Sequence, residues 1–182
     1  IDNMVKDILD ASHSSSNQLP IYPERLDLQV LFDEVLQQQQ KHLQRKNHTI
    51  YTDIPNDLPF AYADKSRIQQ VLNNLIDNAI KYTNDGGEIQ IAILHRTSQK
   101  LQISIKDNGL GIPKEDQNHI FEDRFRLQRD YQTEGYGLGL ALCQRVIRAH
   151  YGRIWVDSEV GCGTTFHFTL PVYRGVTSFE LP

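Results

Sequence analysis

The stretch Asp64-Lys-Ser-Arg-Ile-Gln-Gln-Val-Leu-Asn-Asn-Leu-Ile-Asp-Asn-Ala-Ile-Lys-Tyr-Thr83 has the repeat of an amphipathic helix. Asp64 stands where a side chain can cap the helix start by accepting a backbone N–H. The apolar residues recur at intervals of three or four, which places them on one face of a helix. These residues are Ile68, Val71, Leu72, Leu75 and Ala79. We therefore expect a helix packed against a core.

A polar stripe borders this apolar face. At ~100° per residue, Asn74, Asn78 and Lys81 share one side of the helix. Two amide oxygens and an ammonium beside a core suit a divalent cation and a phosphate chain. The plainer interpretation is the solvated edge of an ordinary helix, and the choice between the two depends on the rest of the chain.

Composition narrows the class of protein. The 182 residues, 39% hydrophobic and 23% charged, are typical of one globular domain with extra segments at its ends. A net charge of −4 gives no argument for nucleic acid or a membrane surface, and no apolar run approaches the ~20 residues that span a bilayer. We expect reduced thiols at Cys143 and Cys162, no structural metal, and a cytoplasmic protein cut at Ile1 from a longer chain.

Helix and strand patterns follow one another without regular βαβ units. This order favours an α+β fold, a two-layer sandwich in which a mixed β-sheet carries helices on one face. Between residues 108 and 136, glycines, a proline and charged residues replace any periodic pattern, which predicts a functional loop or lid. The expected helices cover 28–46 and 138–150, the second ended by Gly152. The expected strands cover 26–28, 49–53, 59–62, 88–96, 101–107, 153–158 and 164–172.

Two glycine-rich motifs suit a nucleotide. Asp107-Asn-Gly-Leu-Gly111 follows a predicted strand, where a carboxylate can accept a hydrogen bond from an amine such as that of adenine. Its glycines would let the backbone approach a flat ring, although the motif alone is also a common turn. Gly135-Tyr-Gly-Leu-Gly139 opens a predicted helix, where free N–H groups bind phosphate. A Rossmann motif is rejected because an Arg-rich segment, and no strand, lies directly upstream.

Together with Gly161-Cys-Gly-Thr-Thr-Phe166, these motifs occur in a specific order. Over residues 22–173 the chain resembles the ATP-binding domain of sensor histidine kinases, in the wider fold group of gyrase, Hsp90 and MutL. The resemblance implies a domain that binds ATP and Mg²⁺ and donates the γ-phosphoryl group to a histidine. The chain would then comprise the end of a dimerisation helix with its linker (1–20), the catalytic domain (21–174) and a disordered tail (175–182).

The resemblance also implies roles for individual residues. Asn78 would bind Mg²⁺, with Asn74 supporting it one turn earlier. Lys81 would contact phosphate, and Tyr82 would pack near the adenine or ribose. Asp107 would accept the adenine amine. The other cofactor-binding positions would be Gly109, Gly111, Gly137, Leu138, Gly139 and Thr164.

The lid departs from the family pattern, because Arg124 stands where a second aromatic is expected after Phe121. Arg126 best matches the catalytic lid arginine that reaches the γ-phosphate, and Arg129 is the alternative; a solvated loop is the competing interpretation. No histidine has the acidic neighbour and nearby proline of a phosphoacceptor, His13 included. The resemblance therefore places the acceptor on a separate dimerisation domain.

Two other functions compete with the kinase interpretation. ATP-hydrolysing machines of the same fold carry a glutamate base where this chain has Asn74, and asparagine cannot take a proton. A degenerate interaction module is disfavoured by the intact motifs. Residues 122–127, 133–145 and 148–158 further resemble output kinases of cyanobacterial circadian clocks. Expected partners are the dimerisation domain of a homodimer, a response regulator and, through an upstream domain, a clock ATPase, with no nucleic-acid or membrane contact.

Overall fold

A five-stranded mixed sheet and three helices make two layers in residues 19–127 and 137–175, the part that the computed structural model describes. The helices are α2 (Leu28–Arg45), α3 (Lys65–Tyr82) and α4 (Gly139–Ala149), and the strands are β1 (Glu24–Leu26), β2 (Thr49–Asp53), β3 (Ala61–Ala63), β4 (Glu88–Thr97), β5 (Lys100–Asp107), β6 (Ile154–Glu159) and β7 (Gly163–Pro171). The sheet order is β2-β4-β5-β7-β6, with β2 parallel to β4 and the other neighbours antiparallel. Strands β1 and β3 form a separate antiparallel pair.

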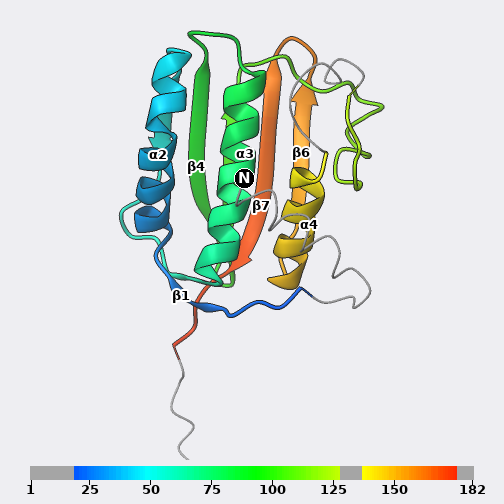
Figure 1. Cartoon of the computed structure of the whole chain (residues 1–182). Coiled ribbons are helices and arrows are strands. Elements are labelled where there is room, and N and C mark those ends of the chain that lie inside the picture. The colour runs from blue at the N-terminus through cyan, green and yellow to red at the C-terminus, as the bar shows by residue number, and fades with distance from the viewer. Residues whose placement is uncertain (1–18, 128–136, 176–182) are drawn as a thin grey trace, which may run out of the picture.

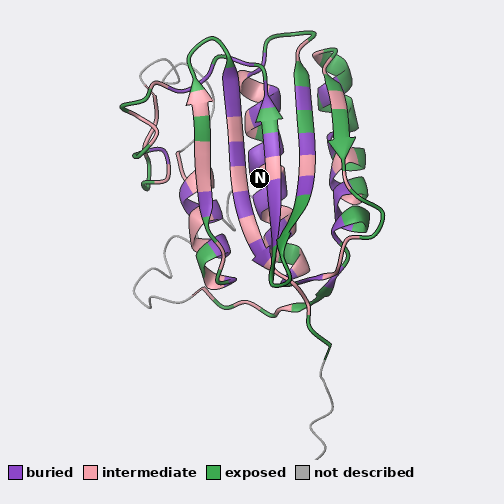
Figure 2. Cartoon of the chain, turned by 180° about the vertical axis from the view of Figure 1, so that it is seen from behind, coloured by how far each residue is buried: buried purple, intermediate pink, exposed green. Residues whose placement is uncertain are grey.

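The helices all lie on one face of the sheet (Figure 1), and the view from behind shows the opposite face open (Figure 2). Alternation along β4 explains this arrangement, because Ile89, Ile91 and Ile93 are fully buried while Gln90 and Leu94 are exposed. Burying each such side chain stabilises the fold by roughly 1.5–3 kcal/mol. The predicted α+β sandwich is therefore confirmed.

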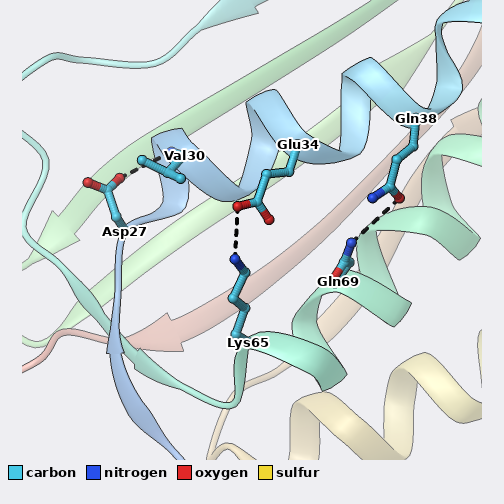
Figure 3. A network of polar contacts seen from close by, with 6 residues as sticks. All are labelled: Asp27, Val30, Glu34, Gln38, Lys65 and Gln69. Atoms are coloured by element: carbon cyan, nitrogen blue, oxygen red, sulfur yellow. Dashed lines mark hydrogen bonds and ion pairs between the residues drawn. The ribbon is translucent and has the colours of Figure 1, made fainter.

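Helix α3 lies between α2 and α4 in the helical layer and contacts both (Figure 1). Its predicted cap is present, since Asp64 Oδ1 accepts a hydrogen bond from the Arg67 N–H at 3.1 Å. Polar contacts then join α3 to α2 along their exposed edge, with Lys65 Nζ 2.8 Å from Glu34 Oε1 (Figure 3). A partly exposed ion pair of this kind contributes about 0–1 kcal/mol, so the buried apolar face provides most of the contact energy.

Two predicted strand positions need correction. The strand expected at 26–28 lies at Glu24–Leu26, because Asp27 instead caps α2 by accepting a first-turn N–H at 3.3 Å. The strand expected at 59–62 lies at Ala61–Ala63, where it pairs with β1. Pairing between segments distant in sequence sets both registers, so local pattern could not fix them.

The end of α4 also differs from the prediction. The residue in the left-handed conformation is Tyr151 (φ +56°), and Gly152 follows it. The Tyr151 N–H donates to Arg148 O at 2.9 Å and the Gly152 N–H donates to Ile147 O at 2.9 Å, which is the Schellman pattern of helix termination. Glycine is required at 152 for a different reason, because a Cβ there would lie 2.1 Å from Thr169 O.

Some predictions lie outside the described residues. They include most of the expected dimerisation segment with His13, most of the expected tail, and Arg129. Residues 109–127 of the expected lid are described and contain no helix or strand. None of the helices in residues 19–127 and 137–175 has the length and apolar character needed to cross a membrane.

Candidate nucleotide site

The polar stripe of α3 lies on the edge of the helix, as its spacing predicts. Asn74, Asn78 and Lys81 are all half-buried beside the fully buried Leu75. Asn74 Nδ2 donates to Gln70 O at 3.1 Å. Its oxygen faces α4, where a Cβ on Gly139 would lie 2.6 Å from Asn74 Oδ1. The stripe therefore lines the junction between α3 and the N-terminus of α4.

Asp107 ends β5 with its carboxylate almost fully buried, at 5% exposure. Oδ1 accepts hydrogen bonds from the Gly109 N–H at 2.9 Å and the Thr164 N–H at 3.2 Å. Oδ2 has no hydrogen-bond partner among the described residues, so it can accept from a ligand. Burial raises the pKa of Asp107, and the two amide hydrogen bonds oppose that rise.

The turn after Asp107 packs tightly against α3 and the β6–β7 connection. The Leu110 N–H donates to Tyr82 O at 3.1 Å. A Cβ at Gly109 would lie 2.3 Å from the same oxygen, and one at Gly111 would lie 2.0 Å from Glu159 O. Gly111 also has φ +69°, which side chains disfavour. Both predicted glycines are therefore needed for this wall of the site.

Ser158 supports this wall and was not found from the sequence. Its hydroxyl donates to Gly163 O at 2.8 Å and accepts from the Ile112 N–H at 2.8 Å. Thr164 Oγ1 lies 2.9 Å from Ser158 Oγ. Because Ser158 has one proton, Thr164 must donate to it, which leaves Thr164 Oγ1 able to accept another hydrogen bond. The sequence does carry one signal for Ser158. It is a polar residue two positions after Val156, on the same face of the strand, where an apolar residue would be expected.

The glycine-rich segment meets the start of the lid. The Arg124 N–H donates to Gly137 O at 3.0 Å, which joins the two ends of the intervening stretch. Leu138 occupies the N-cap position of α4 without a side-chain hydrogen bond. Backbone N–H groups in the first turn of a helix are therefore presented beside Asn74 and Gly139.

The first lid residues contact the core and α4. Phe121 packs its ring edge-on to Phe166, with centroids 6.4 Å apart, and Asp123 pairs with Arg145 at 2.9 Å. Arg124, which replaces an expected aromatic, has φ +64° and is exposed. Arg126 is half-buried two residues later.

Among the described residues, the side chains near the site offer few ligands for a metal ion. Within residues 19–127 and 137–175, His, Cys, Asp and Glu side chains form no group of three or more at a possible metal site. The half-buried Asn78 offers one amide oxygen, which together with ligand phosphates suits Mg²⁺, because this ion is commonly bound through one or two protein oxygens plus phosphate.

The fold and this strand-end carboxylate are those of a nucleotide-binding α+β domain. The sequence pattern described as "Histidine kinase-, DNA gyrase B-, and HSP90-like ATPase" matches residues 63–174. The chain therefore belongs to that family, as its motifs predicted.

One curated protein and two solved structures show what this chain is similar to within the family. Adaptive-response sensory kinase SasA of Crocosphaera subtropica is 54% identical over 174 residues, covering 96% of this chain and 46% of that protein. Full-length ShkA in complex with AMPPNP superposes with a TM-score of 0.82 at 26% identity, covering 94% of this chain and 36% of ShkA. Histidine kinase ThkA in complex with response regulator TrrA superposes with a TM-score of 0.75 at 28% identity, covering 94% of this chain and 47% of the matched chain. The chain spans about half the length of the curated relative, 46%.

Proposed function

We propose that this chain is the catalytic part of a sensor histidine kinase, which binds ATP with Mg²⁺ and transfers the γ-phosphoryl group to a histidine on a separate dimerisation domain. The observation that carries the proposal is Asp107, a buried carboxylate fixed through one oxygen and able to accept an adenine amine through the other. The membership of the family and the ShkA complex with AMPPNP support adenine nucleotide as the ligand.

The polar residues of α3 supply the groups that a phosphate chain requires. Asn78 would hold Mg²⁺, which when bound supplies positive charge to the phosphates. Lys81 adds an ammonium at the end of the same stripe, and Tyr82 lies beside it, with Lys81 Nζ 5.0 Å from the ring centroid. In this proposal Tyr82 packs near the adenine or ribose.

The remaining site residues would shape and close the pocket. The Gly109 and Gly111 turn, which packs against Tyr82 O and Glu159 O, would form the wall beside the adenine ring, with Thr164 behind Asp107. The N–H groups of Gly137, Leu138 and Gly139 would bind phosphate at the start of α4. Arg126 would approach the γ-phosphate and meet the charge that develops during transfer.

The asparagine at position 74 suits transfer of the γ-phosphoryl group to another side chain better than it suits hydrolysis of ATP. Asn74 Nδ2 donates to Gln70 O, and an asparagine amide cannot remove a proton from water. Phosphoryl transfer depends mainly on positioning and charge neutralisation. In this proposal Asn74 orders the α3–α4 junction and contributes no general base.

The whole protein would take part in a two-component pathway. The ThkA complex with TrrA supports a response regulator as partner, and the identity with the adaptive-response sensory kinase SasA supports a sensory pathway. The resemblance of residues 122–127, 133–145 and 148–158 to circadian output kinases favours a role in circadian output. We infer a homodimer through the dimerisation domain, a clock ATPase bound through an upstream domain, and a cytoplasmic location.

Calorimetry tests nucleotide binding directly. We expect Asp107→Ala to weaken ATP and ADP by at least about 10-fold, because it removes one charge-assisted hydrogen bond. Asp85→Ala removes an exposed carboxylate from a nearby turn and should bind like the unmodified chain. Equal affinities in all three proteins would place the adenine elsewhere, and loss of binding in Asp85→Ala would reveal a general charge effect.

A further inference from the structure

The C-terminal end of α3 is held by a lysine from another element. The last carbonyl groups of an α-helix have no partner within the helix. Here Lys46 Nζ donates to Ile80 O at 2.9 Å, to Lys81 O at 3.2 Å and to Thr83 O at 3.3 Å. Lys46 follows α2 directly and is half-buried. One ammonium therefore satisfies three carbonyls that lie 34 to 37 positions away in the chain.

The carbonyl of Tyr82, which lies among these three, has a different partner. It accepts the Leu110 N–H at 3.1 Å, from the turn that follows Asp107. The end of α3 is consequently held from two sides, by Lys46 and by the adenine-facing turn. Lys81 and Tyr82 belong to this helix end, so its position sets the distance between the phosphate-binding and adenine-binding parts of the site.

Backbone hydrogen bonds hold the turn that contains Lys46 in place. Lys46 O accepts the Gly86 N–H at 2.8 Å, and the Gly87 carbonyl accepts the Thr49 N–H at 3.0 Å. The turn after α2 is thereby joined to the turn after α3. Arg45, the preceding residue, is exposed, which provides a matched cation outside this contact.

We propose that Lys46 is a positioning residue for nucleotide binding, which fixes the end of α3 against the Leu110 turn. Its charge lies at the negative end of the helix dipole. There it also reduces the repulsion between the helix carbonyls and an anionic ligand. The consequence for ATP rests on the proposed function, whereas the consequence for the turn does not.

Three variants separate position from charge. Lys46→Gln removes the ammonium, Lys46→Arg keeps the charge, and Arg45→Gln is the control. In Lys46→Gln, we expect hydrogen exchange at the Leu110 N–H to accelerate about 10-fold and ATP to bind about 10-fold more weakly, as for loss of a charged hydrogen bond. Adenosine, which lacks phosphates, should lose less affinity than ATP. Lys46→Arg should restore most of both properties, and Arg45→Gln should match the unmodified chain.

The outcomes distinguish the two proposals. If Lys46→Gln speeds exchange at the Leu110 N–H but leaves ATP affinity unchanged, Lys46 is merely structural and the positioning role is overturned. Unchanged exchange at the Leu110 N–H in this variant would also overturn it. If the unmodified chain binds no ATP while Leu110 responds to Lys46→Gln, the proposed function fails and the contact between Lys46, α3 and the turn stands.

A measurement on the unmodified chain covers the case in which Lys46→Gln does not fold. The ammonium ¹⁵N resonance of Lys46 should show slow proton exchange and shift when ATP is added, because its hydrogen bonds lie beside the site. The exposed Lys41 provides the comparison. Exchange at Lys46 as fast as at Lys41 would overturn the proposal.

Discussion

Asp107, the residue proposed to accept the adenine amine, carries a charge whose burial opposes folding. Burial raises its pKa above the ordinary value, although the Gly109 and Thr164 amides act in the opposite direction. A carboxyl with a raised folded pKa adds stability below its unfolded pKa, near about 4. That contribution is lost as pH rises through the folded value. At neutral pH, the ionised side chain therefore reduces the free energy of unfolding while it remains the best acceptor for an amine.

The variant Asp107→Asn separates these two effects. Its amide oxygen can still accept from Gly109 and Thr164, but the charge is gone and an N–H₂ group would face the adenine amine. We expect greater stability to urea at pH 7, with the difference from the unmodified chain growing as pH rises above about 4. ATP should bind at least about 10-fold more weakly. Urea titrations across pH and calorimetry measure both, with Asp85→Asn as control; a variant less stable at neutral pH contradicts this account.

Candidate site residues that belong to a local sequence pattern could be predicted from the sequence. Residues whose place depends on contacts with distant parts of the chain could not. The stripe of Asn74, Asn78 and Lys81 follows from helical periodicity, and Asp107 from its place after an alternating strand. Ser158 receives the Ile112 N–H across 46 positions, and Lys46 reaches Thr83 O across 37. No local pattern encodes such pairs, because the packing of the elements creates them. The ligand roles themselves remain predictions.

Among the helices and strands, the end of α4 holds two adjacent residues, Tyr151 and Gly152, whose substitutions should change stability in opposite directions. Tyr151 adopts φ +56° although its side chain is 87% exposed. Replacing it by glycine should raise the free energy of unfolding by about 0.5 kcal/mol, because relief of left-handed strain exceeds the entropy cost of glycine. Gly152→Ala should lower it by about 1–3 kcal/mol, since its Cβ would overlap Thr169 O.

Chemical denaturation of both variants checks the sign of each change. Gly175→Ala is the control, because its Cβ would meet nothing within 4 Å and its φ is not positive. If Tyr151→Gly were destabilising by as much as Gly152→Ala, side-chain packing at 151 would outweigh the strain.

A buried histidine joins the end of α4 to the start of α3. His150 Nε2 accepts the Asp64 N–H at 2.9 Å, and Nδ1 lies 2.8 Å from Val146 O, to which it must donate. Only neutral imidazole satisfies both contacts. Burial lowers the pKa of His150, although the Val146 carbonyl and the Asp64 carboxylate favour the charged form. Protonation would therefore break a junction between two helices that carry the site.

The sign of the pH effect follows from that lowered pKa. The stabilisation from His150 is present above its unfolded pKa, about 6.5, and is lost as pH falls through the lower folded value. The loss amounts to at most about 1.4 kcal/mol per pH unit. His150→Gln can accept and donate at the same positions without titrating, so its stability should fall less on acidification. Denaturation between pH 7 and 5 measures this, with exposed His95→Gln as control. Equal slopes in all three proteins would exclude His150 as the titrating group.

At the scale of the whole molecule, the antiparallel β5–β7 pair brings distant residues to one end of the sandwich. Asp107 and Thr164 are register partners there, and Gly139 at the start of α4 abuts Asn74 of α3. The residues proposed to bind the nucleotide are therefore brought together within one domain. The chain's 182 residues contain no histidine in a phosphoacceptor context. Donor and acceptor should consequently be separable.

Radiolabelled ATP tests that separation. We expect this chain alone to show neither self-labelling nor rapid ATP hydrolysis, and to label a separately supplied dimerisation domain in trans, because transfer requires mainly in-line positioning. Arg126→Ala should slow transfer by about 100-fold and weaken ATP binding much less, since the charge that the arginine meets grows in the transition state. Exposed Arg148→Ala on α4 is the matched control. Label on His13 of the lone chain, or fast phosphate release that Asn74→Ala abolishes, would instead indicate self-phosphorylation or a hydrolase, because either activity needs an acceptor or a base within this chain.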